Sequence, residues 1–479
     1  MSLKLFNTLS RSLEPFEPLD LTGRSVGMYC CGPTVYDYGH IGNFRTFVFS
    51  DLVRRTLEFR GFAVRHVMNI TDVEDKILRR LRETGLSLRD YTGKYEKAFL
   101  EDLAELNCRM PHHLPRATEF MPQMIELVAK LLKRGIAYQT PDGSVWFSIT
   151  QYQGCGCRYG QLVKLNFDEM RAGERVSGDE YDKEAAADFG LWKARVPEDG
   201  SVFWPSPWGD GRPGWHLECS AMSTALLGPS FDLHLGGEDL AFPHHEDEIA
   251  QSEGALEYPP GKRFVKYWLH AAHLLVEGKK MSKSLGNFYT LRDLRAKGYS
   301  GREIRQLLLS AHYRETFNFT LEGLDGARSA LSRIDECVAK LRGLATSQTG
   351  SANVDVLARF TEALDDDLNV SKAWSVVFDW VRDQNRLLAA GGVTSALAAA
   401  AIATWDRLDE VLGLGRRLED PTPADAMALL DARTAAKKAR DFARADAIRN
   451  ELKEMGWLVE DTSTGPKLKR IEIGSDRPE

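Results

Sequence analysis

The strongest constraint on the fold lies in residues 25–70, where a strand pattern, a glycine-rich loop, a helix pattern and a second strand pattern follow one another. Ser25–Cys31 is rich in β-prone residues, and Phe62–Ile70 repeats that character. Between them, apolar residues at three-to-four spacing predict a helix over Phe44–Phe59. This order predicts a βαβ unit, whose strands are parallel and joined by a right-handed crossover.

The loop before this helix has the character of a phosphate site. Gly39 and Gly42 let the backbone approach a ligand, and a helix N-terminus offers unpaired N–H groups and partial positive charge. His40 lies at that point, where it is placed to donate to a phosphate oxygen. A glycine-rich turn with a hydrogen-bonded histidine is the alternative that the loop alone leaves open.

Polar residues also follow the second predicted strand. Ligands of open parallel sheets bind beyond the carboxyl ends of the strands, where Asn69 and Thr71 lie. The acids Asp72, Glu74 and Asp75 come next, directly before a predicted helix. Capping of that helix is their favoured interpretation, and ligand binding is the alternative.

The sheet pattern returns after a stretch of different character. Residues 111–213 contain a Gly/Cys-rich loop and an acidic connector, and we interpret them as an insertion. A helix at 215–228 and a strand at 231–235 resume the sheet. Asp239 follows the Gly236–Gly237 pair, where it suits a ribose hydroxyl or forms a turn.

Helical spacing from residue 301 to about 415 predicts a bundle, and a final segment follows Pro421 and Pro423. The expected fold class is α/β: a split Rossmann-like parallel sheet with an inserted connective domain, followed by an α-helical bundle and a small C-terminal domain. The expected bounds are 1–110 and 214–275 for the two halves of the sheet domain, 111–213 for the insertion, 276–315 for a loop and the region that follows it, 316–415 for the bundle and 416–479 for the last domain.

Composition limits the function classes. The chain has 479 residues, a net charge of −7 and seven cysteines, an odd number that does not form a disulfide framework. We find neither an apolar run of about 18 residues nor a secretion signal, so we expect a cytoplasmic protein without a membrane segment. The negative net charge argues against non-specific binding along nucleic acid. Residues 431–470, however, carry a surplus of three positive charges, which favours an anionic partner.

Four residues at the predicted ligand edge form a chemically sound zinc set of two thiolates, an imidazole and a carboxylate. The candidate ligands are Cys31, Cys219, His244 and Glu248. His244 and Glu248 are four residues apart, so they share a helix face. Sequence spacing does not show that the four converge, and Cys30 and His245 are the neighbouring alternatives.

Two further segments carry reactive side chains. Lys279–Asn287 is a basic loop with two hydroxyls, suited to a polyphosphate, although a solvated loop is the default interpretation. Cys155 and Cys157 are separated by a single glycine, and we favour loop thiols over a metal pair because no second thiol pair or histidine lies nearby.

Together, His40-Ile-Gly-Asn43 and Lys280-Met-Ser-Lys-Ser284 resemble the two signature motifs of class I aminoacyl-tRNA synthetases. Three more segments resemble the cysteine-specific family of that class, and this resemblance spans essentially the whole chain. They are Cys31-Gly-Pro-Thr-Val-Tyr-Asp37, Pro213-Gly-Trp-His-Leu-Glu-Cys-Ser-Ala-Met222 and Phe242-Pro-His-His-Glu246. The resemblance implies ATP-dependent activation of L-cysteine to cysteinyl-adenylate and transfer to the 3′-terminal adenosine of tRNA(Cys).

The resemblance also implies the site residues. It places one Zn²⁺ on Cys31, Cys219, His244 and Glu248. It assigns charge stabilisation to His40, Asn43, Lys280 and Lys283. ATP, with Mg²⁺, is expected to contact His40, Gly42, Asn43, Gly237, Asp239 and Lys283. L-cysteine is expected to contact Gly32, Thr71 and Trp215. The sequence departs from the family at Asn43, usually a histidine, and at Leu468, often a tryptophan that would stack on a base.

A metal gives such an enzyme a means of discrimination. Cysteine and serine differ by one atom, and a pocket that recognises shape supplies only about 1–3 kcal/mol, whereas 10⁴-fold fidelity needs about 5.5 kcal/mol. Zinc prefers the thiolate. Two alternatives stay open: a cysteine ligase of mycothiol synthesis, and a paralogue that binds without catalysis. Cysteine-dependent pyrophosphate exchange separates enzyme from binding module. We expect a monomer.

Overall fold

The computed structural model describes residues 2–163, 188–256, 263–282, 285–345, 350–415, 424–439, 441–455, 457–462 and 465–470. These residues divide into two compact units. The first comprises Met1–Leu291 and Gly301–Gly413, and the second comprises Arg292–Ser300 and Leu414–Glu479. In the described part of the chain, no helix combines the length and apolar character needed to cross a membrane.

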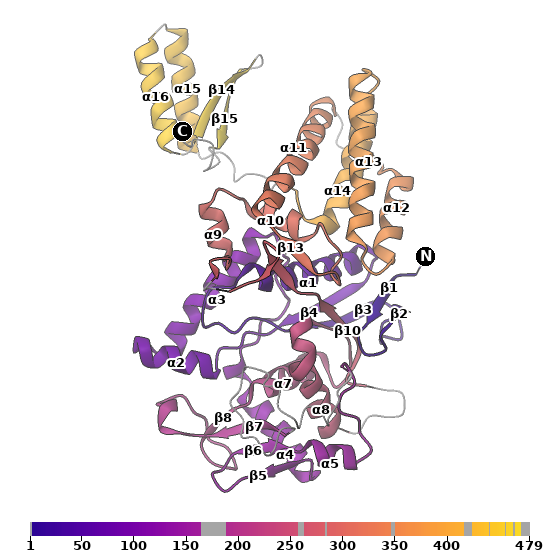
Figure 1. Ribbon diagram of the computed structural model, residues 1–479. Coiled ribbons are helices and arrows are strands. Elements are labelled where there is room, and N and C mark those ends of the chain that lie inside the picture. Colours follow the sequence, from indigo (N-terminus) through magenta and orange to yellow (C-terminus); the bar gives the residue numbers. More distant parts are fainter. Residues whose placement is uncertain are drawn as a thin grey trace. The chain divides into compact units, whose positions relative to one another are not determined.

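A four-stranded parallel sheet lies at the centre of the first unit (Figure 1). Its strand order is β10 (Val265–Ala271), β9 (Phe231–Gly237), β3 (Ser25–Cys30) and β4 (Ala63–Met68). Helix α1 (Ile41–Phe59) connects β3 to β4, so the predicted βαβ unit is present. The expected class, an α/β fold with a split parallel sheet, is confirmed.

The insertion forms its own antiparallel sheet with two helices. The sheet order is β5 (Ala137–Gln139), β6 (Val145–Phe147), β7 (Phe189–Ala194) and β8 (Gly211–Pro213), and the helices are α4 (Met121–Lys133) and α5 (Ile149–Gly154). Its apolar core, which includes Phe147 and Trp192, is continuous with the buried side chains of Cys31 and Cys219. The acidic connector expected at 178–188 lies outside the described residues except for Asp188.

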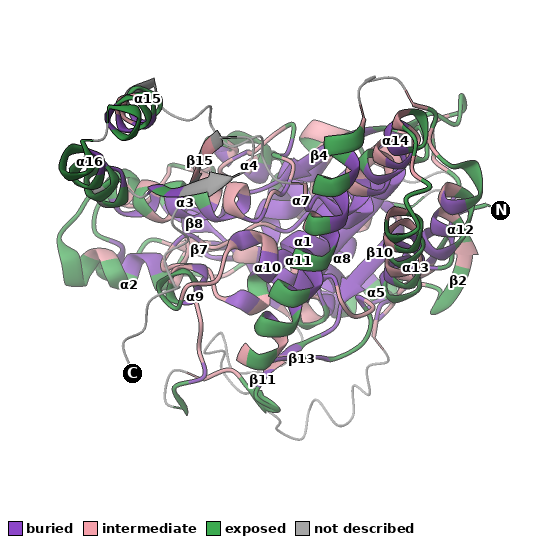
Figure 2. Ribbon diagram, turned by 90° about the horizontal axis from the view of Figure 1, so that it is seen from above, coloured by how far each residue is buried: buried purple, intermediate pink, exposed green. Residues whose placement is uncertain are grey.

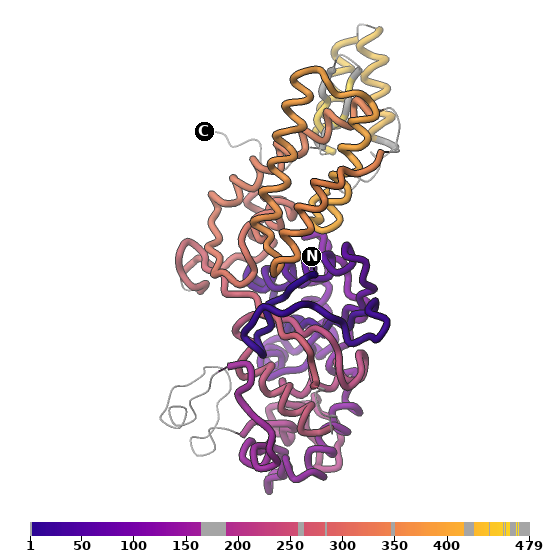
Figure 3. The backbone as a smooth tube through the Cα atoms, turned by 90° about the vertical axis from the view of Figure 1, so that its right-hand side faces the viewer, coloured from indigo at the N-terminus to yellow at the C-terminus, as the bar shows by residue number. Residues whose placement is uncertain are grey.

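A helical bundle occupies the opposite end of the first unit from the insertion (Figure 3). It comprises α10 (Gly301–Leu308), α11 (Leu321–Leu344), α12 (Val354–Asp365), α13 (Val370–Ala389) and α14 (Ser395–Leu412). Buried residues gather around α1 and the strands, whereas the outward faces of α11 and α13 are exposed (Figure 2). The amphipathic spacing of the apolar residues therefore corresponds to the bundle core.

The expectation of a helical pattern from residue 301 to about 415 is wrong at one place. Strand β13 (Phe317–Phe319) pairs in parallel with β11 (Leu274–Val276), which pairs on its other side with β12 (Lys279–Lys280). Phe317 and Phe319 are buried and Asn318 is exposed, which is the alternation of a strand. Three residues are too few for this alternation to stand out from the helical pattern around it.

The remaining elements flank these cores. In the first unit they are β1 (Lys4–Asn7), β2 (Ser12–Pro15), α2 (Asp75–Thr84), α3 (Leu88–Glu105), α7 (Trp215–Leu227) and α8 (Glu246–Ala255), and α9 spans Leu291–Ala296. The second unit contains α15 (Ala424–Lys438), α16 (Phe442–Glu454) and a hairpin of β14 (Trp457–Thr462) and β15 (Gly465–Arg470). Leu468 packs against the small core of this unit.

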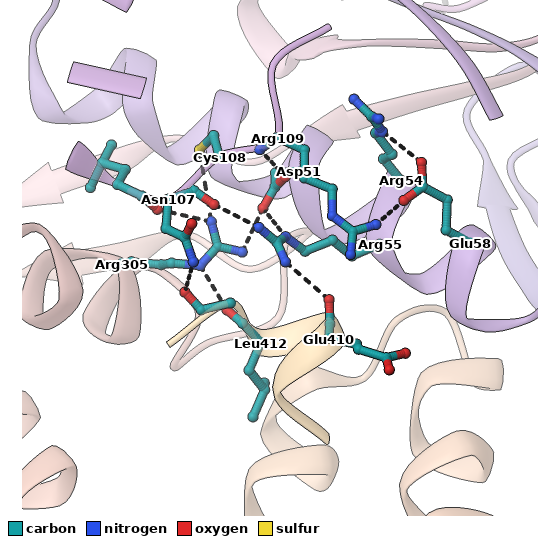
Figure 4. Close-up of polar contacts among 12 residues, drawn as sticks. Asp51, Arg54, Arg55, Glu58, Asn107, Cys108, Arg109, Arg305, Glu410 and Leu412 are labelled. Atoms are coloured by element: carbon teal, nitrogen blue, oxygen red, sulfur yellow. Dashed lines mark hydrogen bonds and ion pairs between the residues drawn. The ribbon is translucent and has the colours of Figure 1, made fainter. Parts of the chain in front are cut away.

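A buried polar network joins α1 to the end of the bundle (Figure 4). Asp51 on α1 accepts hydrogen bonds from Arg55 Nε and Arg305 Nη2, both at 2.6 Å. The same guanidiniums donate to the last carbonyls of α14: Arg55 to Glu410 O at 3.0 Å and Arg305 to Leu412 O at 2.7 Å. These carbonyls have no partner within their own helix, so the two arginines cap α14 and tie it to α1.

Asp51→Asn tests this network. Asp51 is 3% exposed and Arg305 is fully buried, so removing the carboxylate charge leaves a buried cation uncompensated. We expect the free energy of unfolding to fall by about 3–5 kcal/mol, measured by urea titration. Asp379→Asn is the control, because its pair with Arg382 is exposed and contributes at most about 1 kcal/mol. Equal losses in the two variants would contradict a special role for Asp51.

The same pair predicts the acid limit of this contribution. Burial favours the neutral form of Asp51, but Arg305 and Arg55 outweigh it and lower its pKa below 3.8. A depressed folded-state pKa adds stability that is present above the unfolded pKa and is lost as the pH falls through the folded value. The stability difference between the wild type and Asp51→Asn should therefore persist down to about pH 4 and shrink below it.

Candidate metal centre and active site

Four buried donors meet at the carboxyl edge of the parallel sheet. Cys31 directly follows β3, Cys219 lies in α7, His244 lies in the turn Ala241–His245, and Glu248 lies one turn later in α8. Their donor atoms all lie within 4.8 Å of one another, and each residue is at most 5% exposed. The structure therefore brings together the four residues that the sequence singled out.

The donor separations fit a tetrahedral zinc ion. With bonds of about 2.3 Å to sulfur and about 2.1 Å to nitrogen and oxygen, tetrahedral ligands lie about 3.8 Å apart for two sulfurs, 3.6 Å for sulfur and oxygen, and 3.4 Å for nitrogen and oxygen. Cys31 Sγ lies 3.7 Å from Cys219 Sγ and 3.7 Å from Glu248 Oε1. His244 Nε2 lies 3.2 Å from the same Glu248 oxygen.

A second set of donors shares two of these residues. Cys31 and Glu248 also lie within 4.8 Å of His234 and His245. However, His234 Nε2 lies only 2.9 Å from Glu248 Oε2. This distance is that of a hydrogen bond, and it is shorter than the separation between two ligand atoms of one zinc ion. His245 Nδ1 is hydrogen-bonded to His270 Nε2 at 2.8 Å. The first set fits better, with His234 orienting the Glu248 carboxylate from behind.

Neighbouring side chains also fix the orientation of His244. Its Nδ1 lies 2.9 Å from His216 Nδ1, and His216 Nε2 lies 3.5 Å from Asp247 Oδ2. The Trp215 ring stacks on the His244 ring, with centroids 4.3 Å apart. Because Nδ1 is occupied in this way, Nε2 is the nitrogen that remains for a metal, as metal-binding histidines commonly arrange it.

Burial favours the uncharged forms of the four donors. It raises the pKa values of the Cys31 and Cys219 thiols and of the Glu248 carboxyl, and it lowers the pKa of His244. A divalent cation would offset the cost of ionising the thiols and the carboxyl, and its binding would release their protons. This chemistry fits a thiophilic divalent metal such as zinc.

The two signature motifs meet at the start of α1. His40 is the N-cap residue: its Nδ1 accepts a hydrogen bond from the Asn43 backbone at 3.2 Å, while Asn43 Oδ1 accepts one from the His40 backbone at 3.1 Å. Asn43 thus closes a capping box. A Cβ atom at Gly42 would lie 2.7 Å from Met281 Cε, so the basic loop packs directly on this turn.

Asn287 holds the basic loop in shape. Its side chain accepts a hydrogen bond from the Ser282 backbone at 2.8 Å and donates to the carbonyls of Lys280 and Val276 at 3.2 and 3.3 Å. Lys280 is exposed on β12. The predicted Lys283 lies outside the described residues. Asn287 is not among the site residues predicted from the sequence, because its role depends on contacts that form only in the folded loop.

Asp239, the predicted ribose contact, and the glycine pair Gly236–Gly237 lie at the end of β9. A Cβ atom at Gly237 would collide with Asp239 Oδ1, and one at Gly236 would lie 2.5 Å from His245 Cε1. The two glycines therefore allow the strand end to pass between Asp239 and the histidine. Asp239 is exposed at this edge.

Two of the three predicted cysteine contacts, Gly32 and Thr71, are linked by hydrogen bonds through Asn69. The Gly32 N–H donates to Asn69 Oδ1 at 2.8 Å, Asn69 Nδ2 donates to Thr71 Oγ1 at 3.1 Å, and Thr71 Oγ1 donates to Glu218 Oε2 at 2.8 Å. Burial, with the neighbouring Cys219, raises the pKa of Glu218. Sequence reasoning missed Glu218, although its spacing from Trp215 and Cys219 places all three on one face of α7.

The acids after β4 are structural. Asp72 accepts hydrogen bonds from the Thr118 backbone and hydroxyl at 2.9 and 2.6 Å, Glu74 caps α2, and Asp75 pairs with Lys193 at 2.7 Å.

The structure also locates the remaining candidate thiols and the alternative ligand His245. Cys30 is buried and belongs to neither set of metal donors found among the described residues, whereas the alternative His245 belongs to the second set. Cys155 is exposed, Cys157 is partly buried, and neither joins a donor set in the described ranges.

Three family models match successive parts of the chain. The model described as tRNA synthetases class I (C) catalytic domain matches residues 17–329. The DALR domain matches residues 359–416, and the cysteinyl-tRNA ligase anticodon binding domain matches residues 419–465.

The chain is also similar over most of its length to known aminoacyl-tRNA synthetases. A cysteine–tRNA ligase of Chlamydia muridarum is 46% identical over 98% of this chain and 100% of its own length, and one of Protochlamydia amoebophila is 44% identical over 98% of each. The structure of Mycobacterium tuberculosis methionyl-tRNA synthetase with methionyl-adenylate shares the fold, with a TM-score of 0.55 and 14% identity over 82% of this chain and 90% of that one. The chain therefore belongs to the cysteine–tRNA ligase family of the class I aminoacyl-tRNA synthetases.

Proposed function

We propose that Cys31, Cys219, His244 and Glu248 hold one Zn²⁺, through which this ligase selects L-cysteine before joining it to tRNA(Cys). The observation that carries the proposal is the agreement of three donor separations with a tetrahedral zinc ion. When bound, Zn²⁺ supplies a soft acceptor that bonds a thiolate far better than a hydroxyl. The chain has to supply the remaining contacts to cysteine, ATP and tRNA.

The residues around the α1 N-terminus are proposed to bind ATP. The helix start offers N–H groups and partial positive charge to the phosphates. His40 and Asn43 lie at that start, and Lys280 precedes Met281, which packs on Gly42. Lys283 is proposed to supply a further positive charge. A carboxylate oxygen of cysteine attacks the α-phosphorus of ATP, a new P–O bond forms, and pyrophosphate leaves with the electrons of the broken bond. Positioning and charge stabilisation are what these residues contribute. Mg²⁺ accompanies ATP.

Two glycine positions and one acid are proposed to complete the nucleotide site. Gly42 and Gly237 are proposed to lie beside the nucleotide, where the lack of a Cβ atom lets Met281 and Asp239 pack closely against them. The exposed Asp239 carboxylate is proposed to accept a hydrogen bond from a ribose hydroxyl. Gly32, Thr71 and Trp215 are proposed to line the cysteine pocket, and the stacking of Trp215 on His244 supports its place there.

The C-terminal half is proposed to hold tRNA(Cys). Residues 316–415 would contact the body of the tRNA. Residues 416–479, which include the small surplus of positive charge at 431–470, would contact the anticodon. The match to an anticodon binding domain supports a tRNA ligase over a mycothiol-type ligase. We propose a cytoplasmic monomer. All seven cysteines are free thiols, as a reducing compartment keeps them.

Cys219→Ser tests the metal proposal. A hydroxyl is a poor zinc ligand, so we expect zinc content to fall below about one tenth of an ion per chain and the KM for cysteine in pyrophosphate exchange to rise about 100-fold or more, with the KM for ATP within about twofold. Cys337→Ser, a buried thiol on α11, is the matched control and should change neither value. Equal losses for cysteine and ATP would count against a metal that holds the substrate.

Lys283→Ala tests the assignment of the basic loop. Removing a cation that stabilises charge on the phosphates should lower kcat for pyrophosphate exchange by about 10²–10³-fold while zinc content stays at one per chain. Lys133→Ala, an exposed lysine at the end of α4, serves as the control. A loss of zinc in Lys283→Ala, or full activity, would contradict the assigned role.

A further inference from the structure

A buried carboxylate beside the metal donors has one oxygen without a partner. Glu218 is 1% exposed, and its Oε2 accepts the Thr71 hydroxyl at 2.8 Å. Its Oε1 has no hydrogen-bond partner, and no cationic side chain of the described residues pairs with it. Buried polar groups are normally hydrogen-bonded, so an unused carboxylate oxygen indicates a donor that arrives with a ligand.

A chain of hydrogen bonds fixes the direction of this carboxylate. Asn69 is oriented because its Oδ1 accepts the Gly32 N–H, so its Nδ2 donates to Thr71 Oγ1. The single hydroxyl proton of Thr71 is then left for Glu218 Oε2. The hydrogen bonds therefore engage Glu218 Oε2 with a donor from the protein. Glu218 Oε1 remains available to a donor from a ligand.

The position of Glu218 relates it to the substrate pocket. Trp215, Glu218 and Cys219 are spaced i, i+3 and i+4 on α7, so they share one helix face. On that face Cys219 Sγ lies 3.7 Å from Cys31 Sγ, and the Trp215 ring stacks on His244. The unused acceptor is thus next to the proposed binding position of the substrate sulfur.

We propose that Glu218 Oε1 accepts a hydrogen bond from the α-ammonium group of the cysteine substrate. This inference rests on the proposed function of the site. Only two carbon atoms separate the sulfur of cysteine from its ammonium nitrogen, so a residue adjacent to Cys219 is within reach of it. With the sulfur and the ammonium both held, the substrate carboxylate is the group left to face ATP. Glu218 is therefore a specificity-determining residue for an α-amino acid.

The test uses Glu218→Gln in the full-length, zinc-loaded enzyme with two ligand fragments. Cysteamine carries the thiol and the ammonium, and 3-mercaptopropionate carries the thiol and a carboxylate without an ammonium. Both are measured as competitive inhibitors of cysteine-dependent pyrophosphate exchange. We expect cysteine and cysteamine to lose about 10–100-fold in affinity, as for a hydrogen bond between charged groups, and 3-mercaptopropionate to stay within about twofold.

Three outcomes overturn the proposal: no loss for cysteamine, equal losses for both fragments, or loss of zinc from the variant. Asp232→Asn is the matched control, because this buried carboxylate on β9 already has both oxygens occupied by the Leu19 and Gly27 N–H groups at 2.5 and 2.7 Å. It should leave the affinities of both fragments unchanged.

A second variant and a wild-type measurement keep the outcome interpretable. Glu218→Asp keeps the charge but withdraws the oxygen by one methylene, so it should give a smaller loss that is still confined to cysteine and cysteamine; an equal loss for 3-mercaptopropionate would again overturn the proposal. The zinc proposal is tested separately by comparing the affinities of the wild-type enzyme for 3-mercaptopropionate and for propionate. If zinc does not hold the thiol, the two affinities will be equal.

Discussion

The proposed active site depends on the burial of four candidate metal donors at one edge of a parallel sheet. Their thiol, imidazole and carboxyl groups come from the end of β3, from α7 and from the start of α8. Because these groups are almost fully removed from water, ionising them is costly unless a cation binds among them. The core of the insertion is continuous with this cluster, so the insertion helps to exclude water from it.

Helix α1 connects this site to the bundle. Its N-terminus carries the capping box of His40 and Asn43, which shapes the proposed nucleotide site. Its middle carries Asp51 and Arg55, and with Arg305 they bind the last carbonyls of α14. One helix therefore positions the proposed nucleotide-binding turn and anchors the bundle proposed to hold tRNA.

The sequence predicted the fold class because the βαβ pattern is local and periodic. It could not show that Cys31 and Cys219 meet, since they are 188 residues apart and their contact depends on how α7 packs on the sheet. Glu218 and Asn287 were missed for the same reason: each is defined by partners that only the folded chain supplies. Strand β13 was missed because three residues carry too little periodicity.

The central claim is that the substrate sulfur joins a metal held by two protein sulfurs. X-ray absorption at the zinc edge of the purified enzyme counts the sulfur neighbours directly. The account predicts two sulfurs at about 2.3 Å without substrate, three with L-cysteine and two with L-serine. A count that stays at two with L-cysteine, or that is below two without substrate, would contradict it.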